Sequence, residues 1–159
     1  MKRCVVLVLG VTILTALAYG QARDTASNVD QNIIKVAVKI KIDILAEILK
    51  GPEFSKILVF GRTKHGVEKL SQMLALKGFK VASIHGNKSQ SQRQKALVFF
   101  KKGAIQILVA TDVAARGLDI YGVSHVINYD MPATYEDYIH RIGRTGRADK
   151  VGKALTFVD

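Results

Sequence analysis

The sequence is poor in residues that cross-link a chain or hold a metal. Its 159 residues include one cysteine, Cys4, which excludes a disulfide framework and a cysteine-rich zinc site. The four histidines, at positions 65, 85, 125 and 140, are too scattered to form a ligand set on one element. Charged residues make up an ordinary 23%, which excludes a disordered or fibrous chain. These absences leave a globular domain without a metal site of its own.

Acidic residues are scarce as well. There are 13 Asp and Glu residues against 24 Lys and Arg residues, which gives a formal net charge of +11. A chain this basic favours an anionic partner, with nucleic acid ahead of a membrane surface. Only Lys2 and Arg3 of the basic residues lie within residues 1–20, so the positive charge belongs to the rest of the chain.

The chain also lacks an apolar run long enough to cross a membrane. The run from Val5 to Ala18 is shorter than the roughly 20 residues that a spanning helix needs, so we expect no membrane partner. It follows two basic residues and ends in Ala18-Tyr19-Gly20, a pattern typical of a secretory leader. We therefore divide the chain into a leader-like segment (1–20), a polar linker (21–32) and one domain (33–159).

Short apolar runs alternate with amphipathic segments after the linker. Continuous apolar runs are typical of strands buried on both faces, and strand-helix alternation predicts a parallel sheet. We expect an α/β fold, an open parallel sheet with helices on both faces, with function at the loops that follow the strands. The predicted strands are 57–60, 81–84, 107–110, 126–129 and 154–158, and the predicted helices are 64–77, 89–102, one that ends at Gly51-Pro52, and one that starts at Thr134.

Two of these loops carry groups that suit an anionic ligand. After the second predicted strand, Gly86 precedes a helix N-terminus, where backbone N–H groups bind phosphate, although a plain connection would look the same. Gln90 and Arg93 lie three residues apart in that helix and can face one side. The loop after the third strand, 111–119, contains a hydroxyl, two carboxylates, an arginine and a glycine; we favour ligand contact over simple helix capping by Thr111 and Asp112.

The strongest local signal is the tract His140-Arg141-Ile142-Gly143-Arg144-Thr145-Gly146-Arg147. Arginine keeps its charge, and its planar fork matches phosphate oxygens in pairs. The spacing predicts that His140, Arg144 and Arg147 share one helical face that ends in a loop. A solvated helix has no need of the interleaved glycines, which favour close approach to a ligand.

A phosphate-binding loop is missing. The nearest match, Gly61 to Gly66, continues with Val67-Glu68 in place of a lysine and a hydroxyl residue, and no paired acids follow a strand to hold magnesium. The chain thus has arginines for a nucleotide that it cannot hold by itself. Such a half-site is typical of arginines that complete the active site of another domain.

Taken together, the segments Ile107 to Ile120, Val126 to Pro132 and His140 to Arg147 resemble the second RecA-like domain of a DEAD-box ATP-dependent RNA helicase. Leu58 to Lys64 resembles motif IV of that family, and His85 to Arg93 resembles motif IVa.

The resemblance implies specific roles. It makes Arg144 and Arg147 the arginine fingers on ATP, with His140 and Arg141 coupling that site to the opposite lobe and Gly117 and Asp119 on the ribose side. ATP with Mg²⁺ is expected to be held mainly by an N-terminal RecA-like lobe. The partner is RNA, bound without sequence preference through its sugar-phosphate backbone. The residues implied in RNA binding are Arg62, Thr63, Gly86, Gln90, Arg93 and Thr111.

The sequence departs from the family pattern at two places. Asn87-Lys88 stands where relatives more often have an acidic residue and a methionine, and the first lobe is not in the sequence. We therefore expect a helicase fragment that is inactive alone and cytoplasmic, with an artefactual leader. The alternatives are a stand-alone RNA-binding module without catalysis and an exported protein that reuses the fold.

Overall fold

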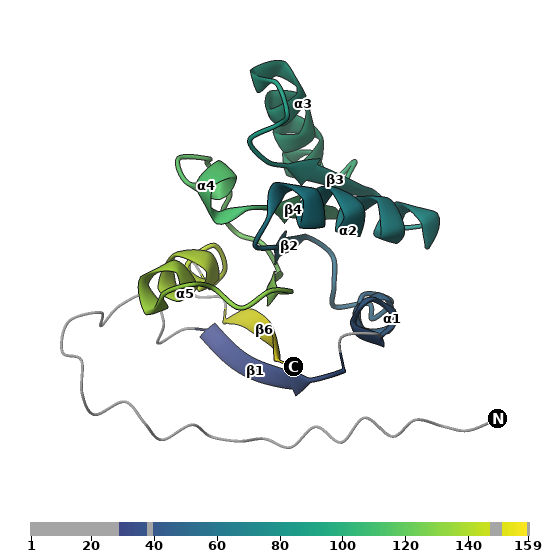
Figure 1. Cartoon of the computed structure of the whole chain (residues 1–159), viewed down its shortest axis with the longest axis vertical. Helices are drawn as coiled ribbons and strands as arrows, with labels where there is room; N and C mark the ends of the chain where they lie inside the picture. The colour runs from purple at the N-terminus through teal and green to yellow at the C-terminus, as the bar shows by residue number, and fades with distance from the viewer. Residues whose placement is uncertain (1–28, 38–39, 147–150, 159) are drawn as a thin grey trace.

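The computed structural model describes residues 29–37, 40–146 and 151–158. They form a six-stranded sheet in which all paired strands run parallel, in the order β1-β6-β5-β2-β4-β3 (Figure 1). The strands are β1 Val29–Lys35, β2 Ile57–Phe60, β3 Val81–Ile84, β4 Ile107–Ala110, β5 His125–Asn128 and β6 Gly152–Val158. The helices are α1 Lys41–Ile48, α2 Lys64–Leu76, α3 Gln90–Lys101, α4 Asp112–Ala115 and α5 Tyr135–Ile142.

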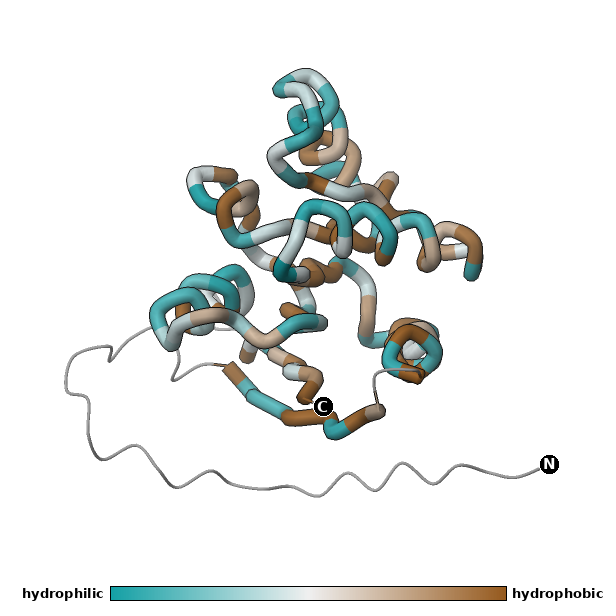
Figure 2. Tube along the Cα trace, viewed as in Figure 1, coloured by the Kyte–Doolittle hydropathy of each residue, from teal (hydrophilic) through white to brown (hydrophobic). Residues whose placement is uncertain are grey.

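Alternate residues of the central strands supply two separate cores. Ile57 and Val59 of β2 pack in the core under α1 and α2, while Leu58 and Phe60 pack in the core under α3 and α4. A smaller cluster, which includes Ile142, lies between α5 and the β1 side of the sheet. Figure 2 accordingly shows brown, apolar tube along the strands in the middle and teal over much of α3 and α5. The predicted α/β class with helices on both faces is confirmed.

Side-chain caps start the helices where the sequence predicts. Ser89 and Gln92 form a reciprocal capping box at α3, and the Thr134 hydroxyl accepts a hydrogen bond from the Asp137 amide at 3.1 Å at α5. Thr63 caps α2 in the same way through the Gly66 amide. In the part of the chain that the structure describes, no helix is long and apolar enough to cross a membrane.

β1 corrects the expected boundary at residue 32. The strand begins at Val29, and its whole length pairs with β6, from Val29 opposite Gly152 to Lys35 opposite Val158. The sequence does not predict this strand because it lacks a continuous apolar run. β1 is an edge strand whose residues, apart from Val29, stay exposed or half-buried. The expected leader and residues 21–28 lie outside the described residues.

Candidate functional site

The loops that follow the central strands meet at one edge of the sheet. The Gly61 amide after β2 donates to the Ala110 carbonyl of β4 at 3.1 Å, and the Thr111 amide after β4 donates to the Ile84 carbonyl of β3 at 3.3 Å. On the other side, the Tyr129 amide after β5 donates to the Phe60 carbonyl at 3.0 Å. The parallel register therefore brings together four loops that are far apart in sequence.

Arg141 is the buried centre of this edge. Its side chain is 2% exposed, and its Nε and Nη2 donate to the two carboxylate oxygens of Asp112 at 2.6 and 2.7 Å. Its Nη1 donates to the Asp130 carbonyl at 2.7 Å and to Asn128 Oδ1 at 3.2 Å, and its Cζ lies 5.0 Å from the Phe60 ring centroid. Arg141 thus joins the ends of β2, β4 and β5.

The Arg141–Asp112 pair gives Asp112 a partner within the domain. The spacing of the arginine tract does not reveal that Arg141 faces inward. The one sequence signal is the adjacent apolar residue Ile142, which is buried in the core. Asp130 follows β5, and its Oδ2 accepts from the Arg62 amide at 2.8 Å. Both aspartates therefore fix the backbone around the expected ligand-binding loops.

Of the residues expected to contact RNA, the threonines after β2 and β4 also cap helices by accepting hydrogen bonds from backbone amides. The Thr63 hydroxyl caps α2, and the Arg62 side chain is exposed beside it. The Thr111 hydroxyl accepts from the Ala114 amide at 3.4 Å and is 8% exposed, so the capping alternative weighed above is present in the structure. Both hydroxyls keep their O–H free to donate, because each is the acceptor in its cap.

The residues after β3 lie together as the sequence predicts. Arg93 Nη2 donates to Gln90 Oε1 at 2.5 Å, so the two side chains share one side of the first turn of α3. Arg93 Nε is buried without a hydrogen-bond partner among the described atoms. Nothing lies within 4 Å of the position that a Cβ on Gly86 would occupy, so the loop backbone there faces open space.

Arg144 lies just beyond the helix rather than on the helical face expected for it. α5 ends at Ile142, and the Arg144 Nη1 and Nη2 donate to the carbonyls of Leu118 and Ala115 at 3.0 and 3.4 Å. Its Cζ lies 5.5 Å from the Tyr121 ring centroid. Arg144 and His140 still line one narrow cleft, together with Phe60, Asp112, Ala115, Arg116, Asp137 and Arg141. Arg147 lies outside the described residues.

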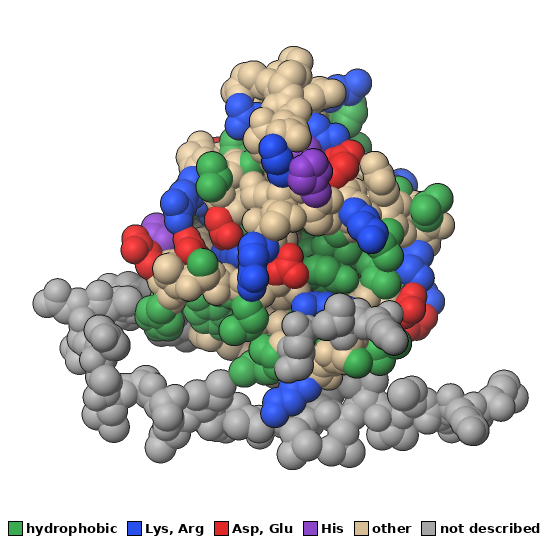
Figure 3. Space-filling view, viewed as in Figure 1, with side chains coloured by type: hydrophobic (Ala, Val, Ile, Leu, Met, Phe, Trp, Pro, Cys, Tyr) green, Lys and Arg blue, Asp and Glu red, His purple; other side chains and the backbone are tan. Residues whose placement is uncertain are grey.

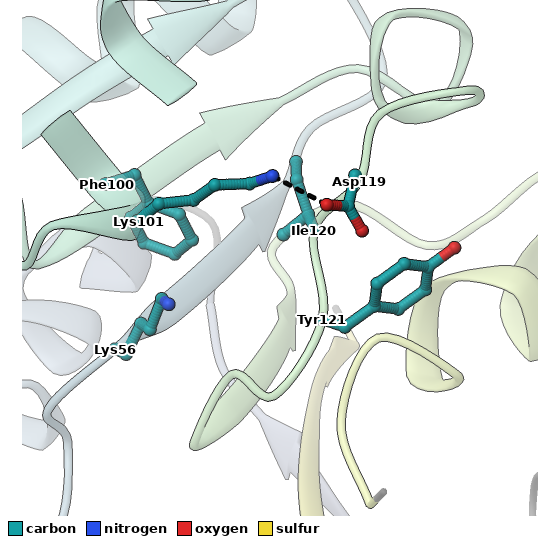
Figure 4. A pocket seen from close by; sticks show the side chains of 6 residues that line it. All are labelled: Lys56, Phe100, Lys101, Asp119, Ile120 and Tyr121. Atoms are coloured by element: carbon teal, nitrogen blue, oxygen red, sulfur yellow. Dashed lines mark hydrogen bonds and ion pairs between the residues drawn. The ribbon is translucent and has the colours of Figure 1, made fainter. Parts of the chain in front are cut away.

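Asp119 borders a surface pocket of about 260 Å³ (Figure 4). The Lys101 side chain extends from the end of α3 to Asp119, and Nζ and Oδ2 are 2.7 Å apart. Gly117, two residues before Asp119, has φ +75°, a backbone conformation that favours glycine. An exposed ion pair of this kind contributes less than about 1 kcal/mol, so a ligand can displace Lys101 at low cost.

Charge around the cleft is partly neutralised. Arg116 pairs with Asp137, whose pKa is held below its usual value mainly by the hydrogen bond from Thr134 and further by Arg116. Elsewhere on the face in Figure 3, Lys and Arg side chains are spread among acidic ones rather than gathered in one patch. Within the described ranges, no cluster of three or more His, Cys, Asp or Glu side chains could hold a metal.

The structure is an open parallel sheet with arginines and threonines at its carboxyl edge, and comparisons with known proteins identify it as a RecA-like lobe and give its family. The helicase conserved C-terminal domain family matches residues 40–149. The DEAD-box ATP-dependent RNA helicase CshA of Geobacillus kaustophilus is 54% identical over 136 residues, which are 84% of this chain and 29% of that helicase.

Two solved structures agree. The E. coli DEAD-box protein SrmB, solved bound to regulator of ribonuclease activity A, superposes with a TM-score of 0.77 at 38% identity over 82% of this chain and 76% of that one. A DEAD-box protein from Methanococcus jannaschii gives 0.77 at 44% identity over 84% of this chain and 36% of that one. The chain therefore belongs to the helicase conserved C-terminal domain family, and within it is the RecA-like second lobe of the DEAD-box type.

Proposed function

We propose that this lobe completes an RNA-dependent ATPase: it presents Arg144 to ATP that a first lobe holds, and it binds the RNA backbone along the carboxyl edge of its sheet. The observation that carries the proposal is which of three neighbouring arginines pair with a carboxylate. Arg141 and Arg116 each face a carboxylate, Asp112 and Asp137. Arg144 is held by carbonyl oxygens and a tyrosine ring, so among the described residues no carboxylate cancels its positive charge.

An uncancelled guanidinium beside a cleft fits a phosphate group. Its N–H donors are arranged in a planar fork that pairs with phosphate oxygens, and such an arginine accelerates phosphoryl transfer by stabilising charge in the transition state. Arg144 would exchange two backbone carbonyls for phosphate oxygens when the lobes close. Arg147 is proposed as a second finger on the strength of the family tract alone.

The nucleotide fits this lobe only in part. The Asp119 carboxylate, which pairs with Lys101, is of the kind that accepts hydrogen bonds from ribose hydroxyls, and Gly117 lies two residues before it. The sequence has no phosphate loop, and the described residues offer no carboxylate cluster for Mg²⁺. We therefore assign no step on this lobe to the metal; the first lobe would hold ATP and Mg²⁺.

Coupling between the lobes would be shared by two residues of different kinds. The His140 side chain is 57% exposed, with Nε2 3.4 Å from Glu136 Oε1, and can contact an opposing lobe directly. Arg141 is buried, so it would act only through the Asp112 and Asp130 loops that it holds. We therefore regard Arg141 as a positioning residue.

The RNA surface would consist of backbone and side-chain donors at neighbouring loops. The Gly86 backbone is open to solvent, Arg93 has an unpaired buried Nε, and the Arg62 side chain is exposed. Thr63 and Thr111 hydroxyls can add hydrogen bonds to phosphate oxygens, and Gln90 orients Arg93. Contacts of this type read the sugar-phosphate backbone and carry no sequence information.

The RNA half of the proposal is tested by Arg93→Ala in the full chain. Fluorescence anisotropy with short labelled single-stranded RNAs of different sequence should show binding about tenfold weaker for every sequence, because one charged phosphate contact is lost. The slope of log Kd against log salt should fall by about one. Lys50→Ala is the matched control, since it removes an exposed cation from the end of α1, away from this edge. A loss confined to some sequences would contradict backbone recognition.

The same assay separates the alternatives. A stand-alone binding module would bind RNA equally with and without ATP and a first lobe, and an exported protein that reuses the fold would have no RNA affinity. We place the proposed activity in the cytoplasm, where ATP and RNA are available together.

A further inference from the structure

Three hydrogen-bond donors converge on Glu68 in the second turn of α2. Ser83 Oγ donates to Glu68 Oε2 at 2.6 Å, His85 Nε2 lies 2.9 Å from the same oxygen, and Lys88 Nζ lies 3.1 Å from the carboxylate. These contacts, led by Ser83 and then His85, lower the pKa of Glu68 from 4.5 to about 2. The carboxylate therefore stays ionised and links α2 to the end of β3 and to the loop after it.

The contacts of His85 fix its tautomer. The Asn87 backbone amide lies 3.3 Å from His85 Nδ1, and a backbone amide can only donate, so Nδ1 is the acceptor. The ring proton is then on Nε2, where it is donated to Glu68. His85 is 4% exposed, so Glu68 is the group that holds this buried ring in one orientation.

The oriented ring shapes the loop 85–88. It holds the Asn87 amide, while the Lys88 amide closes the turn by donating to the His85 carbonyl at 3.0 Å. Lys64 Nζ, from the first turn of α2, donates to Asn87 Oδ1 at 3.1 Å. Gly86 sits at the open side of this turn, one residue from the ring. The Glu68–His85 pair therefore determines where the Gly86 backbone points.

We propose that Glu68 is a positioning residue for RNA binding: through His85 and Lys88 it fixes the loop 85–88 so that the Gly86 backbone receives a phosphate of a single-stranded RNA. The inference rests on the proposed RNA-binding function and adds a residue to it. It also assigns Lys88 to the loop itself rather than to RNA, because Lys88 is committed to Glu68.

The inference predicts that removing the Glu68 charge changes RNA affinity in the direction opposite to that expected from electrostatics alone. Removing a negative charge near a phosphate site should tighten RNA binding if charge is all that matters. Removing a group that shapes the site should weaken binding instead. Glu68→Gln keeps the size of the side chain and removes the charge. Glu47→Gln is the matched control, because Glu47 is an exposed acid on α1 whose carboxylate pairs with Lys50.

The test uses the full chain with a labelled oligouridine as probe, at several salt concentrations. We expect Glu68→Gln to bind about five- to tenfold more weakly than the wild type with a nearly unchanged salt slope, because the uncharged Gly86 backbone contact releases no counterion, while Glu47→Gln binds slightly more tightly. Urea unfolding of Glu68→Gln separates this loss from a general loss of folded protein. Glu68→Asp, whose shorter side chain cannot reach all three donors, should show the same direction of change.

Nitrogen NMR of the His85 ring gives a second readout that needs no RNA. The wild type should show the proton on Nε2, and Glu68→Gln should show broadened ring signals from a His85 ring that is no longer held in one orientation. A folded Glu68→Gln that binds RNA as tightly as the wild type, or one whose His85 ring signals match those of the wild type, overturns the inference while leaving the proposed function standing. A wild-type chain that does not bind RNA at low salt overturns the proposed function, and the inference with it.

Discussion

Replacing Arg141 with alanine should cost this domain a large part of its stability. The substitution removes both hydrogen bonds to Asp112 and leaves the Asn128 Oδ1 and the Asp130 carbonyl without their donor. Asn128 is 0% exposed, so water cannot replace the lost partner there, whereas the Asp112 side chain is 24% exposed and regains some hydration. Breaking a buried ion pair costs about 3 to 5 kcal/mol. The partial exposure of Asp112 places our expectation at about 3 to 4 kcal/mol.

Urea unfolding followed by circular dichroism measures this loss directly. A domain of this size has about 5 to 15 kcal/mol in total, so Arg141→Ala should remain folded only marginally, with Tm lower by about 10 to 15 °C. Arg141→Lys keeps the charge but not the planar fork, so we expect about half the loss. Arg116→Ala is the matched control, because Arg116 is 60% exposed in its pair with Asp137 and should cost less than about 1 kcal/mol. Equal losses for Arg141→Ala and Arg116→Ala would refute the role assigned to the buried pair.

Two further predictions concern stability. Burial lowers the pKa of His125 below its usual 6.5. As the pH drops, the unfolded chain therefore takes up a proton before the folded chain does, so stability should fall below pH 6.5. The fall should be smaller in His125→Phe, which keeps the stacking on Phe54. If the urea midpoints of the wild type and His125→Phe change with pH by the same amount, this prediction is wrong. Gly152→Ala would place a Cβ 2.6 Å from Thr145 Cγ2 and should cost about 1 to 3 kcal/mol, while Gly86→Ala, with open space around it, should be nearly neutral in thermal unfolding. A Gly152→Ala variant as stable as Gly86→Ala would exclude that clash.

The elements predicted correctly are those whose signal is local. β2, β3 and β4 are apolar throughout, or nearly so, and the three threonine or serine caps precede their helices directly. β1 has no such signal, because it is stabilised by its partner β6 rather than by a buried face of its own. The residue types of the candidate site could therefore be read from the sequence, and the strand order could not.

Side-chain direction was the other quantity that the sequence did not reveal. Arg141 and Arg144 stand three residues apart in one tract, yet one is buried against Asp112 and the other lies on backbone carbonyls by the cleft. The difference arises because α5 ends between them, at Ile142. Glu68 was also overlooked, since an acid on a helix usually faces solvent and its three donors come from β3 and the following loop.

The role of Arg144 is tested most directly in a two-lobe protein. Residues 29–159 of this chain would replace the second lobe of the Geobacillus CshA helicase, to which the chain is 54% identical. The chimera should hydrolyse ATP in the presence of single-stranded RNA, and Arg144→Ala should lower kcat by about a thousandfold or more while most RNA binding remains. Lys50→Ala should leave turnover unchanged. Turnover that persists in Arg144→Ala at the level of the unsubstituted chimera would contradict the assignment of Arg144 to the nucleotide phosphates.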